Sequence, residues 1–472
     1  MPYFDPEILA DWSRGEWNRS PSKPVSGFCQ DSRRLCSGDM FVAVRAQRDG
    51  HDFIGEATTA GASAALVERY VHEADLPQLK AVDVGEAFLR IARGHRMRFP
   101  GKVVGITGSC GKTSTKDALQ LLLGRETCFA TEGNFNNLLG VPLTLLQLDS
   151  ELHQRAVVEA GINQPGEMEH LARAIAPDLA LVTMVGPSHL EGLGAVERVA
   201  SEKARLIRES GHVSTAIFPE DCLRFNAFRE ILESEAETLV LKRGNPQEEP
   251  HPGIVYFDTS TETNKAGDTA SLWLKRRGYP ALAFSLPLVS EGMASNCALA
   301  VTAALELGIS TEEISERLPL LKPSALRGKR LRGRGNLYYL DCYNANPASM
   351  LDTIRFFQRL ADEVPKLYVL GGMEELGDGG PGLHRETGAN LRLDSADQVL
   401  LVGEKASWMR EGILTAGTDA EAVNVAQDVE EARGIVAAFE GAVLLKGSRV
   451  NALETLVPEW ATDEENADHA QC

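Results

Sequence analysis

Apolar residues along the chain gather in short runs between turns, and three stretches of the chain differ in how these runs are spaced. In the first stretch, apolar segments at 41–44 and 64–67 follow glycine-containing turns and are typical of short strands. Residues 88–98 have the apolar spacing of a helix, which a Phe-Pro-Gly break at 99–101 interrupts. We therefore predict a small N-terminal α/β domain over residues 1–98.

The second stretch repeats the order strand, loop, helix. Runs rich in Val, Ile and Leu at 103–106, 156–159 and 179–185 alternate with helical segments. This alternation is typical of a parallel sheet whose strands are joined by crossover helices. We predict a central domain with such a sheet over residues 99–320.

A second series of alternating strands and helices follows a Leu-Lys-Pro break at 321–323. Its strands are expected at 337–341, 367–370, 399–402 and 442–445, with helices such as 349–360 between them. This pattern predicts a C-terminal Rossmann-like domain over residues 321–472. The chain as a whole is thus expected to be an α/β protein of three domains.

Length and composition narrow the class of protein. At about 150 residues per domain, 472 residues agree with three domains. The formal net charge of −19 argues against nucleic acid or an anionic membrane as the main partner. No apolar run reaches about 18 residues, and the first residues lack the pattern of a signal peptide. The eight cysteines form no Cys-x-x-Cys pair, which suits a reducing compartment, so we expect a soluble cytoplasmic protein.

The strongest chemical signal is a glycine-rich segment between a predicted strand and a predicted helix. Gly108-x-x-Gly111-Lys112-Thr113 has the residue types of a phosphate-binding loop. Glycines let backbone N–H groups point at phosphate oxygens, while the lysine supplies a positive charge and the threonine a hydroxyl for Mg²⁺. The longer Gly-x-x-x-x-Gly-Lys-Thr form would need glycine at 106, where Ile106 stands. A plain glycine-rich turn is the alternative, and nucleotide binding is the interpretation we favour.

Three further candidates lie in the central stretch. Glu159 ends a predicted strand, and a carboxylate there, beside a phosphate-binding loop, can hold Mg²⁺. His189 follows the next strand and could be a second ligand, although a lone histidine is more often a surface or packing residue. Lys203 lies on a predicted helix, where a solvated lysine is the ordinary interpretation.

Asparagines are concentrated at residues 133–140. The amides of Asn134, Asn136 and Asn137 could bind phosphate or a polar substrate, and they would be costly to bury without partners. On spacing alone, an ordinary turn is the better interpretation.

The last third of the chain places polar residues after two predicted strands. Asp341 could accept ribose hydroxyls, and Lys446 with Arg449 could capture a carboxylate or phosphate. Arg327 begins a cluster of five cations within eight residues, which is equally well interpreted as a phosphate-facing strip or a solvated loop.

Together these motifs resemble the Mur ligases of peptidoglycan synthesis. The resembling segments run in family order at 31–33, 38–43, 49–51, 107–113, 133–142, 188–192, 343–347, 374–377 and 446–449. The Asn-rich segment and Tyr343-Asn344-Ala345-Asn346-Pro347 favour the member that adds D-alanyl-D-alanine. The resemblance implies an ADP-forming ligase that joins this dipeptide to the terminal carboxylate of UDP-N-acetylmuramoyl-tripeptide through an acyl phosphate. It also implies a cytoplasmic monomer that uses ATP and two Mg²⁺ ions.

The resemblance assigns roles to the matched positions. ATP would be bound by Thr107, Gly108, Ser109, Cys110, Gly111, Lys112, Thr113, Asn296, Arg327 and Asp341. Mg²⁺ would be held by Thr113, Glu159, His189 and a carbamylated Lys203, and the catalytic residues would be Lys112, Glu159, His189 and Lys203. The peptide and nucleotide-sugar substrates would be bound by Asp31, Ser32, Arg33, Asn134, Asn137, Asn344, Asn346 and Lys446. A carbamate gives a lysine a carboxylate-like oxygen, which is why a lysine can serve a metal.

The chain departs from the family pattern at four places. Gly372 stands where Asp is common, Gly292-Met293 where a His-Asn pair is usual, and Arg205 where Glu is usual. Residues 45–48 also lack the usual glycine. Because the metal and phosphate residues are all present, we expect a catalytically competent chain.

Two other functions stay open at this point. One is a sibling ligase that adds another amino acid or extends folate with glutamate. The other is a regulatory protein that uses ATP only to change shape. A comparison of amine acceptors separates the first, and tight ATP binding without an amide product would indicate the second.

Overall fold

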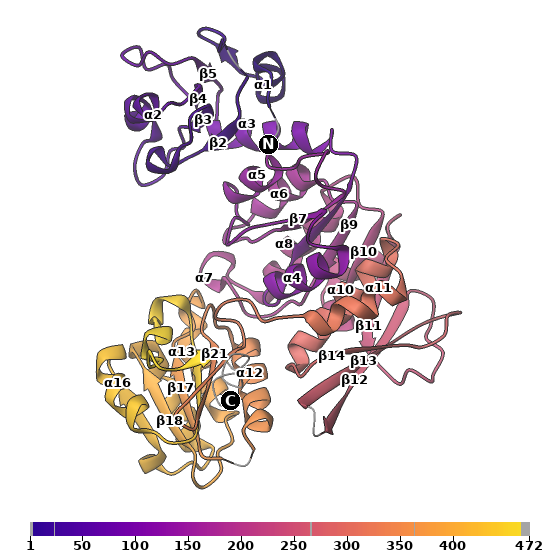
Figure 1. Ribbon diagram of the computed structural model, residues 1–472, viewed down its shortest axis with the longest axis vertical. Helices are drawn as coiled ribbons and strands as arrows, with labels where there is room; N and C mark the ends of the chain where they lie inside the picture. The colour runs from indigo at the N-terminus through magenta and orange to yellow at the C-terminus, as the bar shows by residue number, and fades with distance from the viewer. Residues whose placement is uncertain (1–2, 23, 265–266, 363, 464–472) are drawn as a thin grey trace, which may run out of the picture.

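The computed structural model describes residues 3–22, 24–264, 267–362 and 364–463. Three sheets follow one another along the chain, and Figure 1 shows them as three bodies arranged along the long axis of the molecule. The predicted class, an α/β protein built of three parts, is confirmed. The proposed domain boundaries at residues 98 and 320 stay predictions.

The N-terminal sheet has five short strands in the order β1-β5-β4-β3-β2. The strands are β1 (Glu16–Trp17), β2 (Gly27–Cys29), β3 (Asp39–Val42), β4 (Ala64–Val67) and β5 (Gln78–Lys80). The helices are α1 (Pro6–Ser13), α2 (Ile54–Thr59) and α3 (Val84–Arg96). Strands β2 to β5 are parallel, and β1 pairs with β5 in the antiparallel direction.

The central sheet has nine strands in the order β14-β13-β12-β11-β10-β9-β6-β8-β7. Its strands are β6 (Lys102–Thr107), β7 (Cys128–Ala130), β8 (Arg155–Glu159), β9 (Leu179–Val182), β10 (Thr215–Pro219), β11 (Glu237–Arg243), β12 (Ile254–Asn264), β13 (Gly267–Arg276) and β14 (Leu282–Pro287). Its helices are α4 (Lys112–Leu123), α5 (Gly140–Leu145), α6 (Glu167–Ile175), α7 (Leu190–Leu193), α8 (Val196–Arg208), α9 (Asn226–Arg229), α10 (Glu291–Glu306) and α11 (Thr311–Arg317).

One part of this sheet differs from the parallel arrangement expected from the sequence. Strands β6 to β12 pair in parallel with one another. Strand β13, by contrast, pairs in the antiparallel direction with β12 and with β14. On β12, Val255 and Phe257 are buried while Asp258 is exposed, which is the alternation of a strand covered on one face. In strand order, this antiparallel extension forms one edge of the sheet, whereas the phosphate-binding loop follows the interior strand β6.

The C-terminal sheet has seven strands in the order β19-β18-β17-β20-β16-β15-β21. Its strands are β15 (Lys329–Gly333), β16 (Asn336–Asp341), β17 (Lys366–Gly371), β18 (Gln398–Val402), β19 (Val423–Ala426), β20 (Ala442–Lys446) and β21 (Thr462–Asp463). Its helices are α12 (Pro347–Leu360), α13 (Gly380–Ala389), α14 (Glu404–Ser407), α15 (Met409–Thr415) and α16 (Val429–Ala438). Strands β16 to β20 are parallel, as a Rossmann-like domain requires.

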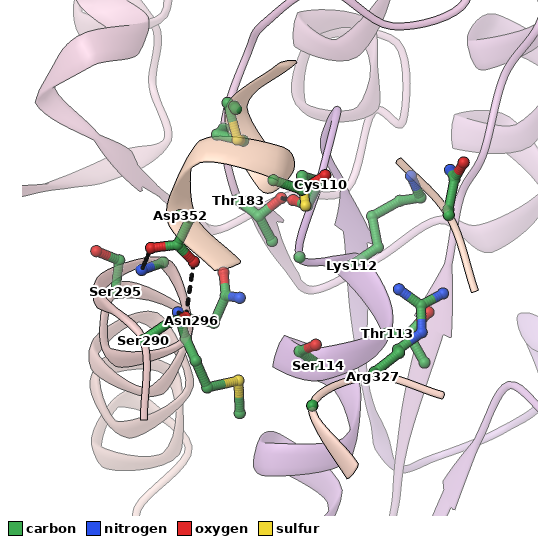
Figure 2. Close-up of a pocket in the computed structure, with 18 of the residues that line it drawn as sticks. Cys110, Lys112, Thr113, Ser114, Thr183, Ser290, Ser295, Asn296, Arg327 and Asp352 are labelled. Carbon is green, nitrogen blue, oxygen red and sulfur yellow. Dashed lines mark hydrogen bonds between the residues drawn. The ribbon is translucent and has the colours of Figure 1, made fainter. Parts of the chain in front are cut away.

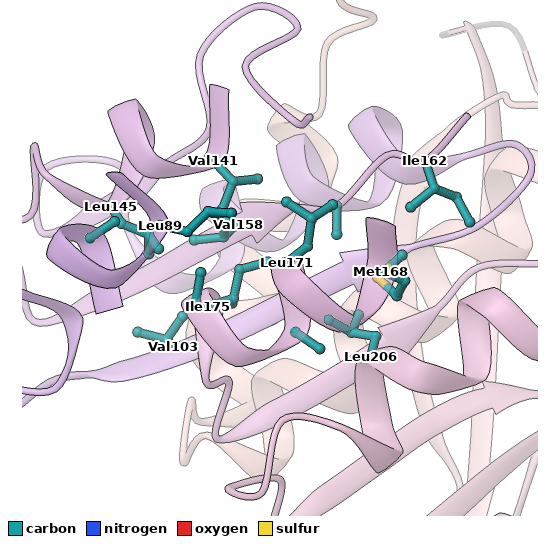
Figure 3. Close-up of a cluster of buried hydrophobic side chains, with 14 of the residues drawn as sticks. Leu89, Val103, Val141, Leu145, Val158, Ile162, Met168, Leu171, Ile175 and Leu206 are labelled. Atoms are coloured by element: carbon teal, nitrogen blue, oxygen red, sulfur yellow. The ribbon is translucent and has the colours of Figure 1, made fainter. Parts of the chain in front are cut away.

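Helix α3 joins the N-terminal and central parts through a shared apolar core. Leu89 on α3 lies beside Val141 and Leu145 of α5, and Leu171 and Ile175 of α6 continue the same cluster (Figure 3). Because burial of each such side chain contributes about 1.5–3 kcal/mol to stability, this contact fixes α3 firmly on the central sheet.

Among the described helices, none has the length and apolar character needed to cross a membrane.

Candidate active site

The glycine-rich segment forms a tight loop between β6 and α4. Gly108 and Gly111 have φ values of +155° and +86°, which glycine adopts far more readily than other residues. A Cβ atom on Gly108 would lie 1.8 Å from Oγ1 of Thr183, and one on Gly111 would lie 2.5 Å from Oδ1 of Asn296. Both glycines are therefore required by backbone shape and by close neighbours, as a phosphate-binding loop predicts.

Neighbouring segments hold this loop in place. The backbone N–H of Ser109 donates to Met184 O at 2.9 Å, and its hydroxyl donates to Gly186 O at 2.9 Å. Nζ of Lys112 donates to Gly108 O at 2.8 Å, so the lysine folds back over the loop that precedes it. Desolvation lowers the pKa of Lys112, and the nearby carboxylate of Glu159 opposes this shift.

Glu159 lies at the end of β8, fully buried directly behind the loop. Its Oε2 accepts a hydrogen bond from Oγ1 of Thr113 at 3.2 Å and one from Nδ2 of Asn136 at 3.5 Å. Its Oε1 has no hydrogen-bond partner among the described atoms, and Nζ of Lys116 is 4.0 Å away. An unpartnered buried carboxylate oxygen beside a threonine hydroxyl fits a hard divalent cation.

Lys203 lies on α8 and is also fully buried. Its Nζ finds no hydrogen-bond partner within the described part of the chain. Desolvation, and then the positive charge of Lys112, lower the pKa of Lys203 well below its usual range. An uncharged, unpartnered amine is the form that can add CO₂, so the residue fits a carbamate and differs from the solvated lysine expected of a surface helix.

His189 is a contact point between the central and C-terminal parts. Its Nδ1 lies 2.5 Å from Oε2 of Glu375. A side-chain hydrogen bond from His189 lowers the pKa of Glu375, and the charge of Lys112 adds to this shift. Within the described residues, no cluster of three His, Cys, Asp or Glu side chains could hold a metal. A metal at Glu159 would therefore need the threonine hydroxyl, a carbamate or substrate oxygens as further ligands.

A cleft of about 1820 Å³ separates the central and C-terminal sheets above these residues. The predicted site residues that line it are Ser109, Cys110, Gly111, Lys112, Thr113, Asn134, Asn137, His189, Asn296, Arg327, Asp341, Asn344, Asn346 and Lys446. Thr107, Gly108, Glu159 and Lys203 lie outside its lining, three of them as buried side chains. The cleft thus brings together predicted residues from both halves of the chain.

The C-terminal wall of the cleft is held by a compact polar network. Nζ of Lys446 donates to Oδ2 of Asp341 at 2.9 Å and to Asn344 O at 3.0 Å. Asn346 begins α12 as its N-cap, and its Nδ2 reaches across to Ser109 O at 3.2 Å. The Arg327 guanidinium lies 4.2 Å from the centre of the Tyr343 ring. Asn346 thereby ties the C-terminal part directly to the phosphate-binding loop.

The N-terminal candidates lie elsewhere. Oδ1 and Oδ2 of Asp31 accept hydrogen bonds from Nε and Nη2 of Arg33 at 2.9 and 2.8 Å, and these bonds lower the pKa of Asp31 to about 2. Oγ of Ser32 donates to Oε2 of Glu56 at 3.0 Å. None of these three predicted residues belongs to the lining of the cleft.

The structure also gives a contact to Asn136, one of the three asparagines considered from the sequence, and adds Lys116, which the sequence analysis did not single out. Asn136, rather than Asn134 or Asn137, is the asparagine that contacts Glu159. Lys116 is buried on α4, where its Nζ donates to Thr131 O at 3.0 Å. Its position four residues after Lys112 places it on the same helix face, which was a usable signal.

Two of the family departures have local explanations. Asp352 of α12 accepts hydrogen bonds from Oγ of Ser290 at 2.7 Å and from the N–H of Gly292 at 3.0 Å (Figure 2). A Cβ on Gly292 would lie 2.6 Å from Oδ2 of Asp352, so a histidine there does not fit beside this carboxylate. A Cβ on Gly372 would lie 2.8 Å from Cβ of Lys405.

At the two remaining departures, Arg205 and the segment at residues 45–48, an arginine contacts nearby glutamates. Nη1 of Arg205 donates to Oε2 of Glu169 at 3.0 Å, and its Nε lies 3.5 Å from Oε1 of Glu202. In the segment without the usual glycine, Nη1 of Arg45 lies 3.2 Å from Oε2 of Glu68. These cations are held by neighbouring carboxylates.

A phosphate-binding loop on a parallel sheet, facing a Rossmann-like partner across a cleft, defines the class of nucleotide-binding α/β proteins. Comparisons with known proteins narrow this class. Residues 106–304 match the Mur ligase middle domain, and residues 327–449 match the Mur ligase glutamate ligase domain.

Full-length relatives agree with these domain matches. The chain is 30% identical to UDP-N-acetylmuramoyl-tripeptide–D-alanyl-D-alanine ligase of Bacillus subtilis strain 168, covering 92% of this chain and 93% of the relative. MurF from Acinetobacter baumannii has a similar crystal structure, with a TM-score of 0.84 and 28% identity over 97% of this chain and 98% of that one. MurF from Thermotoga maritima in complex with ADP gives a TM-score of 0.77 and 27% identity over 92% and 96%. The chain belongs to the Mur ligase family.

Proposed function

We propose that this chain is an ATP-dependent ligase that joins D-alanyl-D-alanine to the terminal carboxylate of UDP-N-acetylmuramoyl-tripeptide in peptidoglycan synthesis. The observation that carries the proposal is the phosphate-binding loop at Lys112 and Thr113, backed by unpartnered atoms of Glu159 and Lys203. The names of the relatives supply the substrates, and the Thermotoga maritima complex with ADP supports a nucleotide in this fold.

The chemistry requires activation of a carboxylate, because oxide is a poor leaving group. The carboxylate oxygen attacks the γ-phosphorus of ATP, the bond to the β-phosphate oxygen breaks, and ADP leaves. The dipeptide amine then attacks the acyl carbon, loses a proton, and displaces inorganic phosphate. Lys112 lies where it can offset the repulsion between the carboxylate and the triphosphate. The cleft between the two sheets would exclude water that hydrolyses the acyl phosphate.

The residues behind the loop fit a bound divalent cation. Mg²⁺ at this place would neutralise charge on the phosphate oxygens. Thr113 and Glu159 would hold one ion, and His189 with a carbamylated Lys203 a second. Asn296, Arg327 and Asp341 would meet the nucleoside, and Lys446 with Asn344 would orient Asp341.

The N-terminal part would bind the UDP moiety through Asp31, Ser32 and Arg33. Because these residues lie outside the cleft lining, the substrate would have to extend from one domain to the other. We further propose that residues 1–98, 99–320 and 321–472 act as separate domains of a cytoplasmic monomer.

Mass-detected product formation tests the function. Purified protein would be supplied with ATP, D-alanyl-D-alanine and a UDP-N-acetylmuramoyl-tripeptide that ends in lysine or in diaminopimelate. We expect the pentapeptide product and one ADP per amide bond. ADP release that is equally fast without the dipeptide, or amide formation only with a different amine, would contradict the proposal.

A further inference from the structure

The contact between His189 and Glu375 joins two parts of the chain that are far apart in sequence. His189 precedes α7 in the central part, and Glu375 lies in the loop between β17 and α13 of the C-terminal part. Nδ1 of the histidine and Oε2 of the glutamate are 2.5 Å apart. The other ring nitrogen, Nε2, takes no part in this contact.

The backbone reinforces this contact on both sides. The N–H of Glu191 donates to Glu375 O at 3.2 Å, and a Cβ on Gly377 would lie 3.2 Å from Cα of Glu191. His189 and Glu375 have φ values of +53° and +60°. A left-handed backbone costs a non-glycine residue about 1–2 kcal/mol, so surrounding contacts must hold each residue in it.

Glu375 is linked to the residues of the cleft through its contact with His189. A histidine that binds a metal through one nitrogen commonly has its other nitrogen held by a carboxylate, which fixes the tautomer and the direction of the ring. His189 lines the same cleft as Lys112 and Thr113. With Nδ1 held by Glu375, Nε2 is the nitrogen left for a cation beside the nucleotide phosphates.

We propose that Glu375 is a positioning residue that orients His189 for the cation of the proposed ligase reaction, an inference that rests on the proposed function. Since Glu375 belongs to the C-terminal part, the histidine is oriented only when the central and C-terminal parts meet. Assembly of the cation site is thereby coupled to closure of the cleft.

The neighbouring glutamate provides a matched control. Glu374 has its carboxylate in an ion pair with Lys405, and its N–H donates to Oγ of Ser448 at 3.1 Å. These partners all belong to the C-terminal part. The variant Glu374→Gln therefore changes a charge in the same loop without touching His189.

Binding of Mn²⁺ to the full chain with a non-hydrolysable ATP analogue, measured by electron paramagnetic resonance, tests this role without any turnover. We expect Glu375→Ala to weaken Mn²⁺ binding by about 10- to 100-fold, as loss of such outer partners does. Glu375→Gln should lose less Mn²⁺ affinity, because the amide oxygen of the glutamine can still accept the proton on Nδ1 of His189. Glu374→Gln should bind as the unaltered chain does.

A double variant separates orientation from simple docking of the two parts. If Glu375 acts through His189, Glu375→Ala should cause no further loss of Mn²⁺ affinity in a His189→Ala background. An equal loss in that background, or Mn²⁺ affinity that Glu375→Ala leaves unchanged, would overturn the proposal. Product formation by the unaltered chain is measured separately, so a failed ligase assay beside normal Mn²⁺ coupling would reject the function alone.

Discussion

Lys203 and Lys446 are both almost fully buried, yet their surroundings differ completely. Lys446 donates to Asp341 and to Asn344 O, so its charge is matched inside the C-terminal part. Lys203 has no partner for its Nζ among the described atoms, and its pKa is lowered by desolvation. A matched buried charge maintains the fold, whereas a buried amine without a partner marks a place where a ligand or a modification completes the structure.

The largest expected effect comes from replacing the unmatched lysine. A bound cation contributes several kcal/mol of charge stabilisation, so Lys203→Met should reduce the rate of ligation roughly a thousandfold. Thermal unfolding should stay unchanged or shift upward, because an apolar side chain replaces an unpartnered amine. ADP-release kinetics and a melting curve give the two readouts. A variant that ligates normally would remove Lys203 from the site.

Replacing Lys446, the lysine with partners, should mainly reduce stability. Lys446→Met leaves Asp341 with Thr353 as its side-chain partner. We expect a loss of about 2–4 kcal/mol in local stability, toward the lower end because the Asp341 side chain is partly exposed. Hydrogen exchange at β16 and β20 measures this, and the double variant with Asp341→Asn should recover part of the loss. Unchanged exchange would show that the pair is not structural.

Asp352 extends the comparison to a partly buried carboxylate whose partners belong to the other half of the molecule. Gly292→Ala places a Cβ 2.6 Å from Oδ2 of Asp352, and such overpacking costs about 1–3 kcal/mol. Adding Asp352→Ala should remove the clash and restore most of the melting temperature. If the double variant melts lower than Gly292→Ala, steric conflict at this contact is not the cause.

The smallest expected effect is a pH dependence of stability at the same carboxylate. Burial raises the pKa of Asp352, with opposition from the hydrogen bonds of Ser290 and Gly292. The folded chain therefore holds this proton more tightly than the unfolded chain. As pH rises from the ordinary carboxyl value through the raised pKa, the unaltered chain should lose stability relative to Asp352→Asn. Paired melting curves between pH 4 and pH 7 measure the difference, and a gap that stays constant would contradict the assignment.

Local sequence was enough to predict the phosphate-binding loop and the strands that carry it. Gly108, Gly111 and Lys112 lie within five residues between an apolar run and a helix start, so their arrangement depends on neighbours in sequence. The buried parallel strands were likewise visible as continuous apolar runs. The antiparallel pairing of β12 to β14 was missed because two-residue alternation was not distinguished from the βα pattern around it.

Contacts between the parts of the chain could not be predicted from local patterns. Glu375 carried no assigned role in the sequence, because its partner His189 is brought to it only by the folded arrangement. Asn346 was assigned to substrate binding, but its Nδ2 contact with Ser109 O across the cleft likewise depends on the folded arrangement. Lys203 had the features of a solvated helix residue, and only its burial reveals that it lacks a partner.

Transfer of oxygen from substrate to phosphate tests the central claim most directly. UDP-N-acetylmuramoyl-tripeptide with ¹⁸O in its terminal carboxylate would be converted with ATP and D-alanyl-D-alanine, and the inorganic phosphate examined by mass spectrometry. If the carboxylate attacks the γ-phosphorus, each amide bond formed leaves one ¹⁸O atom in phosphate. Amide product accompanied by phosphate free of ¹⁸O would contradict the account.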